Sequence, residues 1–203
     1  MSTPGPRRIW ALLSTVAFAA SLVGGFAMSS ASAADVTEAR PPVADVSLDA
    51  SNAGTNLGTA PDLLVDGTPV RRFLMRFDVT PPAGKRLKTA TLGLSCINKS
   101  STGGSVRLVP GTWGELTATH NNAPAFGTQT VATIGSVSAG TRYQIDLTAV
   151  AKTASAGGTA LSIGIVSSSN DGADYVSREG TAAQRPALTI VWEDDPAATP
   201  TPT

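Results

Sequence analysis

Apolar and polar residues alternate over six separate segments of the chain. These segments lie at residues 72–78, 91–97, 105–109, 142–147, 161–165 and 188–192. Successive side chains of a β-strand point to opposite faces, so this alternation predicts strands with one buried face. Stretches rich in glycine or proline, such as Asn170-Asp171-Gly172, separate the segments and predict turns. Many short strands joined by such turns predict an all-β fold, an antiparallel β-sandwich of jelly-roll type.

A few positions need a separate interpretation. Residues 147–155 can form a short helix, with Asp146 placed to cap its first turn. The larger apolar residues and the lone cysteine are expected to pack in the core: Phe73, Cys96, Trp113 and Trp192. Trp113 lies in a Gly-flanked segment, which leaves an exposed ring as the alternative, and Tyr175 is the other aromatic candidate for stacking on a sugar.

The two ends of the chain carry their own patterns. Arg7 and Arg8 precede an uncharged run at residues 9–28, and Ala31-Ser32-Ala33 then supplies the small residues that suit cleavage. This pattern predicts a secretory signal peptide at residues 1–34 and a secreted, extracellular protein, with a retained membrane anchor as the alternative. The remaining predicted parts are a polar lead-in at 35–42, the sandwich module at 43–195 and a Thr/Pro linker at 196–203.

The charge and composition exclude several classes of protein. The chain has 15 basic and 15 acidic groups among 203 residues, and the predicted signal peptide contains two arginines and no acid. A nucleic-acid binder needs a strong basic excess, so no nucleic-acid partner is expected. One cysteine excludes a disulfide framework within the chain, and one histidine excludes sites that need two.

Ten short stretches occur in an order that resembles a known family. They are Asp45-Val46, Asn56-Leu57-Gly58, Leu63-Leu64-Val65, Arg72 to Asp78, Leu87 to Leu92, Trp113-Gly114-Glu115, Asn121 to Gly127, Asp146-Leu147-Thr148, Ser177-Arg178-Glu179 and Pro186-Ala187-Leu188. From Val43 to Trp192 the chain resembles a DNRLRE domain, a carbohydrate-binding module of the family 96 type. The resemblance implies a secreted accessory module beside an enzyme, with ligands that include acidic polysaccharides such as alginate. His120 is the one clear departure, because the family usually has Trp at this point.

Arginine is the residue that suits an acidic polysaccharide, because its planar fork can donate two parallel hydrogen bonds to one carboxylate. The predicted carbohydrate-binding residues are Arg72, Arg76, Arg107 and Arg142, on the outward side of expected strands, and Arg178 in a loop. The alternative is ordinary solvated strand faces, or ion pairs with Asp78 and Asp146. For Arg178 and Glu179 the alternative is a structural tether.

No catalytic residue is predicted, and the expected function is a non-catalytic carbohydrate-binding module accessory to a larger extracellular protein. A structural or adhesive wall-surface domain is the first alternative. A small polysaccharide lyase or glycosidase is the second, for which the chain offers the following side chains: Glu115, His120, Tyr143, Tyr175 and Glu179.

No cofactor or metal is expected, and no membrane partner once the signal peptide is removed. Calcium is the alternative, because Asn170 to Asp174 offers hard oxygens and Asp45 and Asp49 lie near the start of the module. The strict twelve-residue calcium loop is absent, so a tight turn is favoured at residues 170–174. The partner expected is a polysaccharide, and longer relatives are expected to carry a tethered catalytic domain.

Overall fold

The computed structural model describes residues 1–2 and 34–198. The predicted signal peptide, apart from its first two residues and Ala34, and residues 199–203 of the predicted linker lie outside the described residues. Within the described part, no helix has the length and apolar character needed to cross a membrane.

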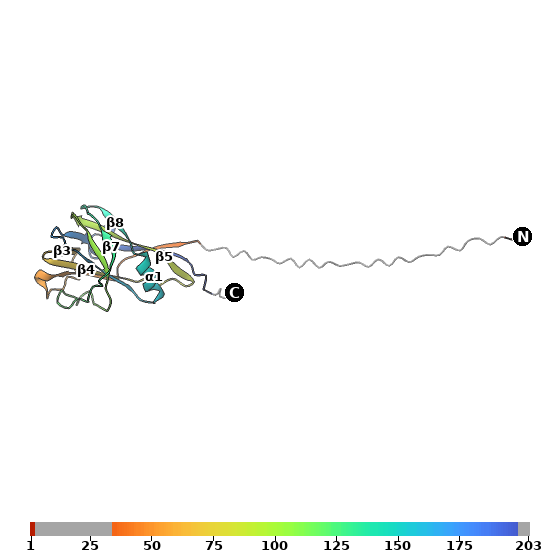
Figure 1. The fold of residues 1–203 in the computed structure, drawn as a ribbon, viewed down its shortest axis with the longest axis horizontal. Coiled ribbons are helices and arrows are strands. Elements are labelled where there is room, and N and C mark those ends of the chain that lie inside the picture. Colours follow the sequence, from red (N-terminus) through yellow and green to blue (C-terminus); the bar gives the residue numbers. More distant parts are fainter. Residues whose placement is uncertain (3–33, 199–203) are drawn as a thin grey trace. The chain divides into compact units, whose positions relative to one another are not determined.

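Strands dominate the described part of the chain (Figure 1). They are β1 (Val36–Arg40), β2 (Ala44–Asp49), β3 (Asp62–Gly67), β4 (Val70–Phe77), β5 (Lys85–Asn98), β6 (Gly104–Leu108), β7 (Thr130–Ile134), β8 (Arg142–Asp146), β9 (Leu161–Val166), β10 (Ala173–Val176) and β11 (Ala187–Asp194). The α-helix is α1 (Thr148–Ala156), and two 3-10 turns occupy Ala50–Asn52 and Ala182–Gln184. Each of the six alternating segments falls on a strand, so the predicted all-β fold is confirmed.

The strands form one curled sheet in the order β1-β11-β5-β10-β3-β4-β9-β6-β7, with β2 added beside β4 and β8 beside β5. Each pairing between these strands is antiparallel. The long strand β5 allows the sheet to fold over, because it pairs with β11 and β8 along most of its length and with β10 near its end. The result is the expected antiparallel sandwich-like arrangement.

The main core lies between the facing halves of this curled sheet. Its largest fully buried side chains include Trp192, Tyr175, Phe73 and Phe77, and Cys96 is buried beside them. The core positions predicted for Phe73, Cys96 and Trp192 are therefore confirmed. Tyr175, a candidate for stacking on a sugar, is instead fully buried and donates its hydroxyl to Gly103 O at 2.9 Å.

A second apolar cluster lies on the other face of β2 and β4. Leu74, which alternation placed on the outward side of its strand, is fully buried there with Val46 and Leu48. Residues 109–127, called the covering loop below, bring Val109, Trp113 and Ala118 over this face. The expectation of an open outer face on β4 was therefore wrong, because an irregular segment packs on it.

Two boundaries differ from the sequence-based expectation. Residues 36–40, expected in a lead-in outside the module, form strand β1 and pair with β11 from Val36↔Trp192 to Arg40↔Leu188. The helix begins at Thr148, one residue later than expected, with Leu147 at the N-cap position. The Asp146 carboxylate still accepts a hydrogen bond from the Thr148 backbone N–H at 2.9 Å, so it satisfies a free donor at the helix start.

Candidate functional site

The covering loop is attached to the sheet by a short motif before β3. The Asn56 side chain donates hydrogen bonds from Nδ2 to Glu115 O and Ala118 O, both at 2.7 Å. Gly58 lies so close to the loop that a methyl group there would collide with the Glu115 carbonyl. These residues fix the path of a segment that has no strand or helix of its own.

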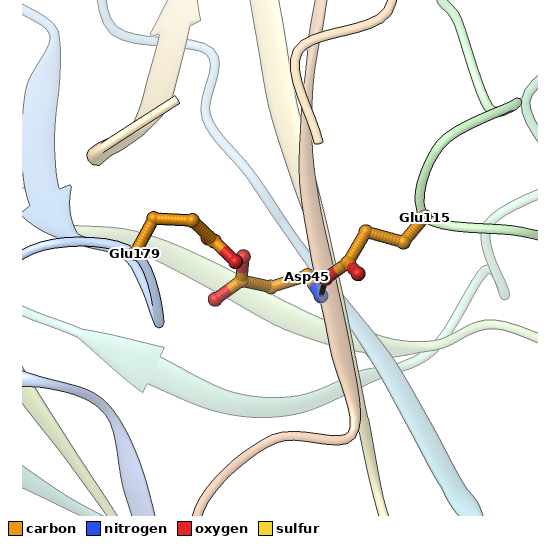
Figure 2. Close-up of side chains that lie close together, drawn as sticks. All are labelled: Asp45, Glu115 and Glu179. Carbon is orange, nitrogen blue, oxygen red and sulfur yellow. Dashed lines mark hydrogen bonds between the residues drawn. The ribbon is translucent and has the colours of Figure 1, made fainter. Parts of the chain in front are cut away.

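Three carboxylates gather where β2, the covering loop and the segment after β10 meet (Figure 2). Asp45, Glu115 and Glu179 form this carboxylate cluster, and one oxygen of each lies within 4.8 Å of the others. Arg178 is their counter-charge, with Nη1 at 3.1 Å from Glu115 Oε1 and Nε at 3.1 Å from Glu179 Oε1. The Arg178 backbone N–H donates to Asp45 Oδ2 at 2.9 Å, and the Asp45 N–H donates to Glu115 Oε1 at 2.9 Å. The cluster thus cross-links three segments that are distant in sequence.

The electrostatics of this cluster favour a neutral Asp45. Burial, together with the smaller effect of the neighbouring charges of Glu179 and Glu115, raises the pKa of Asp45 to about 7 against the lowering effect of the Arg178 backbone N–H. Asp45 is 1% exposed, so solvent does little to stabilise its charge. One arginine opposite three carboxylates leaves a negative excess that a proton on Asp45 relieves.

Two arginines of β4 lie against aromatic rings of the covering loop. The Arg72 guanidinium is 4.8 Å from the centre of the Phe126 ring, and the Arg76 guanidinium is 4.9 Å from the centre of the Trp113 ring. Arg76 also donates from Nη1 to Trp113 O at 2.8 Å, while Trp113 Nε1 donates to Ser162 Oγ at 2.9 Å. The loop rings therefore hold both guanidinium planes in place.

Arg107 of β6 belongs to the same face of the sheet. It pairs with Gly164 of β9, and Gly164 pairs in turn with Leu74 of β4. Residues directly opposite in neighbouring strands share a face, so Arg107 lies on the side that carries Arg72. Phe126 packs directly on Gly164, where a side chain would overlap its ring.

We call Arg72, Arg76 and Arg107 the arginine face. In the part of the chain that the structure describes, no carboxylate forms an ion pair with any of the three. The acids expected as partners are used elsewhere: Asp78 pairs with Arg40 at 3.7 Å, and Asp146 accepts from the Thr148 backbone N–H at the start of α1.

The hydrogen bonding of the arginine face is incomplete. Nε of Arg72 and Nε of Arg107 are buried without a hydrogen-bond partner. Arg72 Nη2 lies 3.4 Å from His120 Nε2, and Arg107 Nη1 donates to Thr128 O at 2.7 Å. Burial lowers the pKa of Arg72, because it removes part of the water around the charged guanidinium. The face thus holds partly desolvated cations whose charge the protein does not balance.

The other two predicted arginines lie elsewhere. Arg142, on β8, donates to Ser95 Oγ at 3.1 Å and to Arg185 O at 3.0 Å, in the part of the sheet built on β5. Arg178 is engaged by Glu115 and Glu179 in the carboxylate cluster. The structure therefore brings together three of the five predicted residues. Sequence reasoning did not connect them with Trp113 and Phe126, whose position depends on the path of the covering loop.

The groups considered for catalysis or calcium have structural contacts. The Tyr143 hydroxyl accepts from the Ser138 N–H at 2.7 Å. Asp171 accepts from the Ser101 N–H at 2.8 Å, and Asp49 pairs with Arg71 at 3.3 Å. Among the described residues, the group with spacing suited to a metal ion is the carboxylate cluster, where Arg178 already supplies positive charge.

Comparison with known proteins identifies the wider family. A gellan lyase from Bacillus sp is 32% identical to this chain over 200 residues, which cover 94% of this chain and 8% of the relative. The chain thus spans a small part of that longer protein. Residues 36–192, from β1 to β11, match carbohydrate-binding module family 96. With this match over most of its length and the antiparallel β-fold described above, the chain belongs to carbohydrate-binding module family 96.

Proposed function

We propose that this protein is a secreted, non-catalytic module that binds an acidic, alginate-like polysaccharide through Arg72 and Arg107 of the arginine face, as an accessory to a larger extracellular protein. The observation that carries the proposal is that three arginines share one face and have no carboxylate partner among the described residues. An unpaired cation that is partly removed from water destabilises the folded protein. A ligand carboxylate would supply the missing charge.

Arg72 and Arg107 are the members of the face that we assign to the polysaccharide. Each has an amino group that is not buried and bonds to no protein atom: Nη1 of Arg72 and Nη2 of Arg107. Phe126 and His120 contact the rest of the Arg72 guanidinium, and the carbonyls of Gly127 and Thr128 accept from Nη1 of Arg107. Cations fixed in this way lose little side-chain entropy when a carboxylate binds, which favours recognition of a chain with regularly spaced uronates.

A lyase is the second candidate because the relative is named a gellan lyase. The contacts in this chain favour binding without catalysis. Glu115 and Glu179 are both bound to Arg178, and Tyr175 is fully buried with its hydroxyl bonded to Gly103. A general acid or base needs access to the substrate, which these contacts restrict.

Affinity electrophoresis in gels containing alginate, pectate or gellan tests the proposal. We expect the native protein to be retarded by at least one of these anionic polysaccharides and the double variant Arg72→Gln, Arg107→Gln to lose roughly tenfold or more in affinity. The control is Arg142→Gln, which also removes an arginine without a carboxylate partner but lies on β8.

Each outcome bears on one part of the proposal. An equal loss of binding free energy per removed charge in the Arg142→Gln control and the double variant would show that net charge, and not the arginine face, determines binding. Absence of retardation by all three polysaccharides would favour the structural or adhesive alternative. Release of unsaturated products that absorb in the ultraviolet would show that the module is a lyase.

A further inference from the structure

A cavity of about 590 Å³ opens between the start of β9, the helix α1 and the turn at residues 108–112. Its walls are largely aliphatic, formed by Leu108, Val109, Pro110, Val150, Ala154 and Leu161. Small-molecule sites in proteins have volumes of roughly 300 to 1,000 Å³ and an apolar lining with a few fixed polar groups. This cavity has both properties.

The hydroxyl groups in its walls are largely engaged within the protein. Thr153 donates to Ala149 O at 3.2 Å, and Thr159 donates to Ala154 O at 3.3 Å. Ser162 accepts from Trp113 Nε1 at 2.9 Å. A sugar ring would lose hydrogen bonds to water here and regain few, which disfavours a carbohydrate as the occupant.

Arg76 is the charged group in the wall of the cavity. Its Nη1 is held by the Trp113 carbonyl and its guanidinium lies over the Trp113 ring, so its direction is fixed. Its other guanidinium nitrogens, Nε and Nη2, have no hydrogen bond within the described residues, yet they are not buried as Nε of Arg72 is. They are therefore available to a ligand that enters the cavity.

We propose that this cavity binds a small apolar carboxylate, with its hydrocarbon part against the aliphatic walls and its carboxylate on Arg76. Charge complementarity favours a ligand with a carboxylate group, because a guanidinium without an acidic partner can bind a planar carboxylate through two hydrogen bonds. The aliphatic lining favours a ligand with a hydrocarbon chain, because burying apolar surface away from water contributes favourably to the free energy of binding. This site is separate from the Arg72 and Arg107 contacts assigned to the polysaccharide and does not depend on them.

Titration calorimetry with decanoate as the probe tests this assignment. We expect one decanoate to bind per chain, and the uncharged decanamide to bind roughly 10- to 100-fold more weakly, because hydrogen bonds to charged groups contribute the difference. Arg76→Gln should show the same loss for decanoate while changing decanamide little. Arg142→Gln, outside the cavity, should bind decanoate as the native protein does.

A second variant keeps the test decisive if Arg76→Gln loosens the covering loop. Ala160 is exposed and lines the cavity, so Ala160→Phe fills space and leaves Arg76 in place. This variant should lose both decanoate and decanamide. The assignment is overturned if the native protein binds no decanoate, if decanoate and decanamide bind equally, or if Ala160→Phe binds both as the native protein does. The polysaccharide gels, which contain no decanoate, report on the proposed function independently.

Discussion

The carboxylate cluster predicts that the protein becomes less stable as the pH rises toward neutrality. In the folded state burial, together with Glu179 and Glu115, raises the pKa of Asp45 from 3.8 to about 7. A group whose pKa is raised in this way binds its proton more tightly when folded, so its stabilising effect is complete below the unfolded pKa. That effect is lost as the pH rises through the folded pKa. Substitution of Asp45 by Asn removes the titration and keeps the shape of the side chain.

The size of the effect follows from the shift. One pKa unit corresponds to about 1.4 kcal/mol, so Asp45 alone lowers the free energy of unfolding by about 4 kcal/mol between pH 4 and pH 8. The shifts of Asp78 and Asp146 have the opposite sign, because hydrogen bonds from Thr80 and Thr148 lower their pKa values. Their stabilisation is present above the unfolded pKa and is lost in acid, so measurements above pH 4.5 separate them from Asp45.

Urea denaturation of the folded module at pH 4.5, 6, 7 and 8 measures this dependence. The native protein should lose about 3 kcal/mol across this range, and Asp45→Asn should lose much less and be the more stable protein at pH 8. The control Asp49→Asn removes another buried carboxylate of β2, one that pairs with Arg71 outside the cluster, and should keep the native slope. Parallel pH profiles for the native protein and Asp45→Asn would refute the reasoning.

Other predictions concern the covering loop and the arginine face. Asn56→Ala should lower the free energy of unfolding by about 2 kcal/mol in urea, because it removes two hydrogen bonds to the loop. Gly164→Ala should cost about 1 to 3 kcal/mol in the same assay, since its methyl group overlaps the Phe126 ring; an unchanged value would show that the ring moves aside freely. Raising NaCl from 50 to 500 mM should weaken retardation by acidic polysaccharides, because salt screens exposed charges. Millimolar CaCl₂ should leave the unfolding temperature unchanged, since Arg178 already balances part of the carboxylate cluster, whereas a clear rise would show that a cation binds there.

Six strands of the described part could be predicted from the sequence, because alternation indicates which face is buried: β4, β5, β6, β8, β9 and β11. In β4, Phe73 and Phe77 alternate with Arg72 and Arg76, and the face that packs in the main core was identified by its chemistry. Strand β2 shows why the rule has limits. It also alternates, as Ala-Asp-Val-Ser-Leu-Asp, but its polar residues are buried as completely as its apolar ones. Asp45 accepts a hydrogen bond from Arg178, and Ser47 donates one to the Asp62 carbonyl, so partners outside the strand satisfy both buried side chains and leave no local pattern.

The candidate site could be predicted only in part for a similar reason. Every second side chain of a strand points to the same face, so the sequence of β4 alone places Arg72 and Arg76 together. That Arg107 lies on the same face depends on the order of β4, β9 and β6 in the sheet. The covering loop has no periodicity, so the stacking of Phe126 on Arg72 has no local signal. Arg142 fits the outward pattern equally well and still lies beside β5, because alternation identifies a face of one strand and not its neighbours.

The stretches that identify the family serve mainly to build the scaffold. Asp45, Asn56 and Arg178, which lie in those stretches, tie the covering loop and the segment after β10 to the sheet. These contacts are internal, so a sequence match on them establishes the fold and says little about the ligand. The clear departure in the sequence, His120, lies beside Arg72 on the arginine face. We therefore expect ligand preference within the family to be set where the covering loop meets the arginines, and the carboxylate cluster to set the pH range over which that loop is held in place.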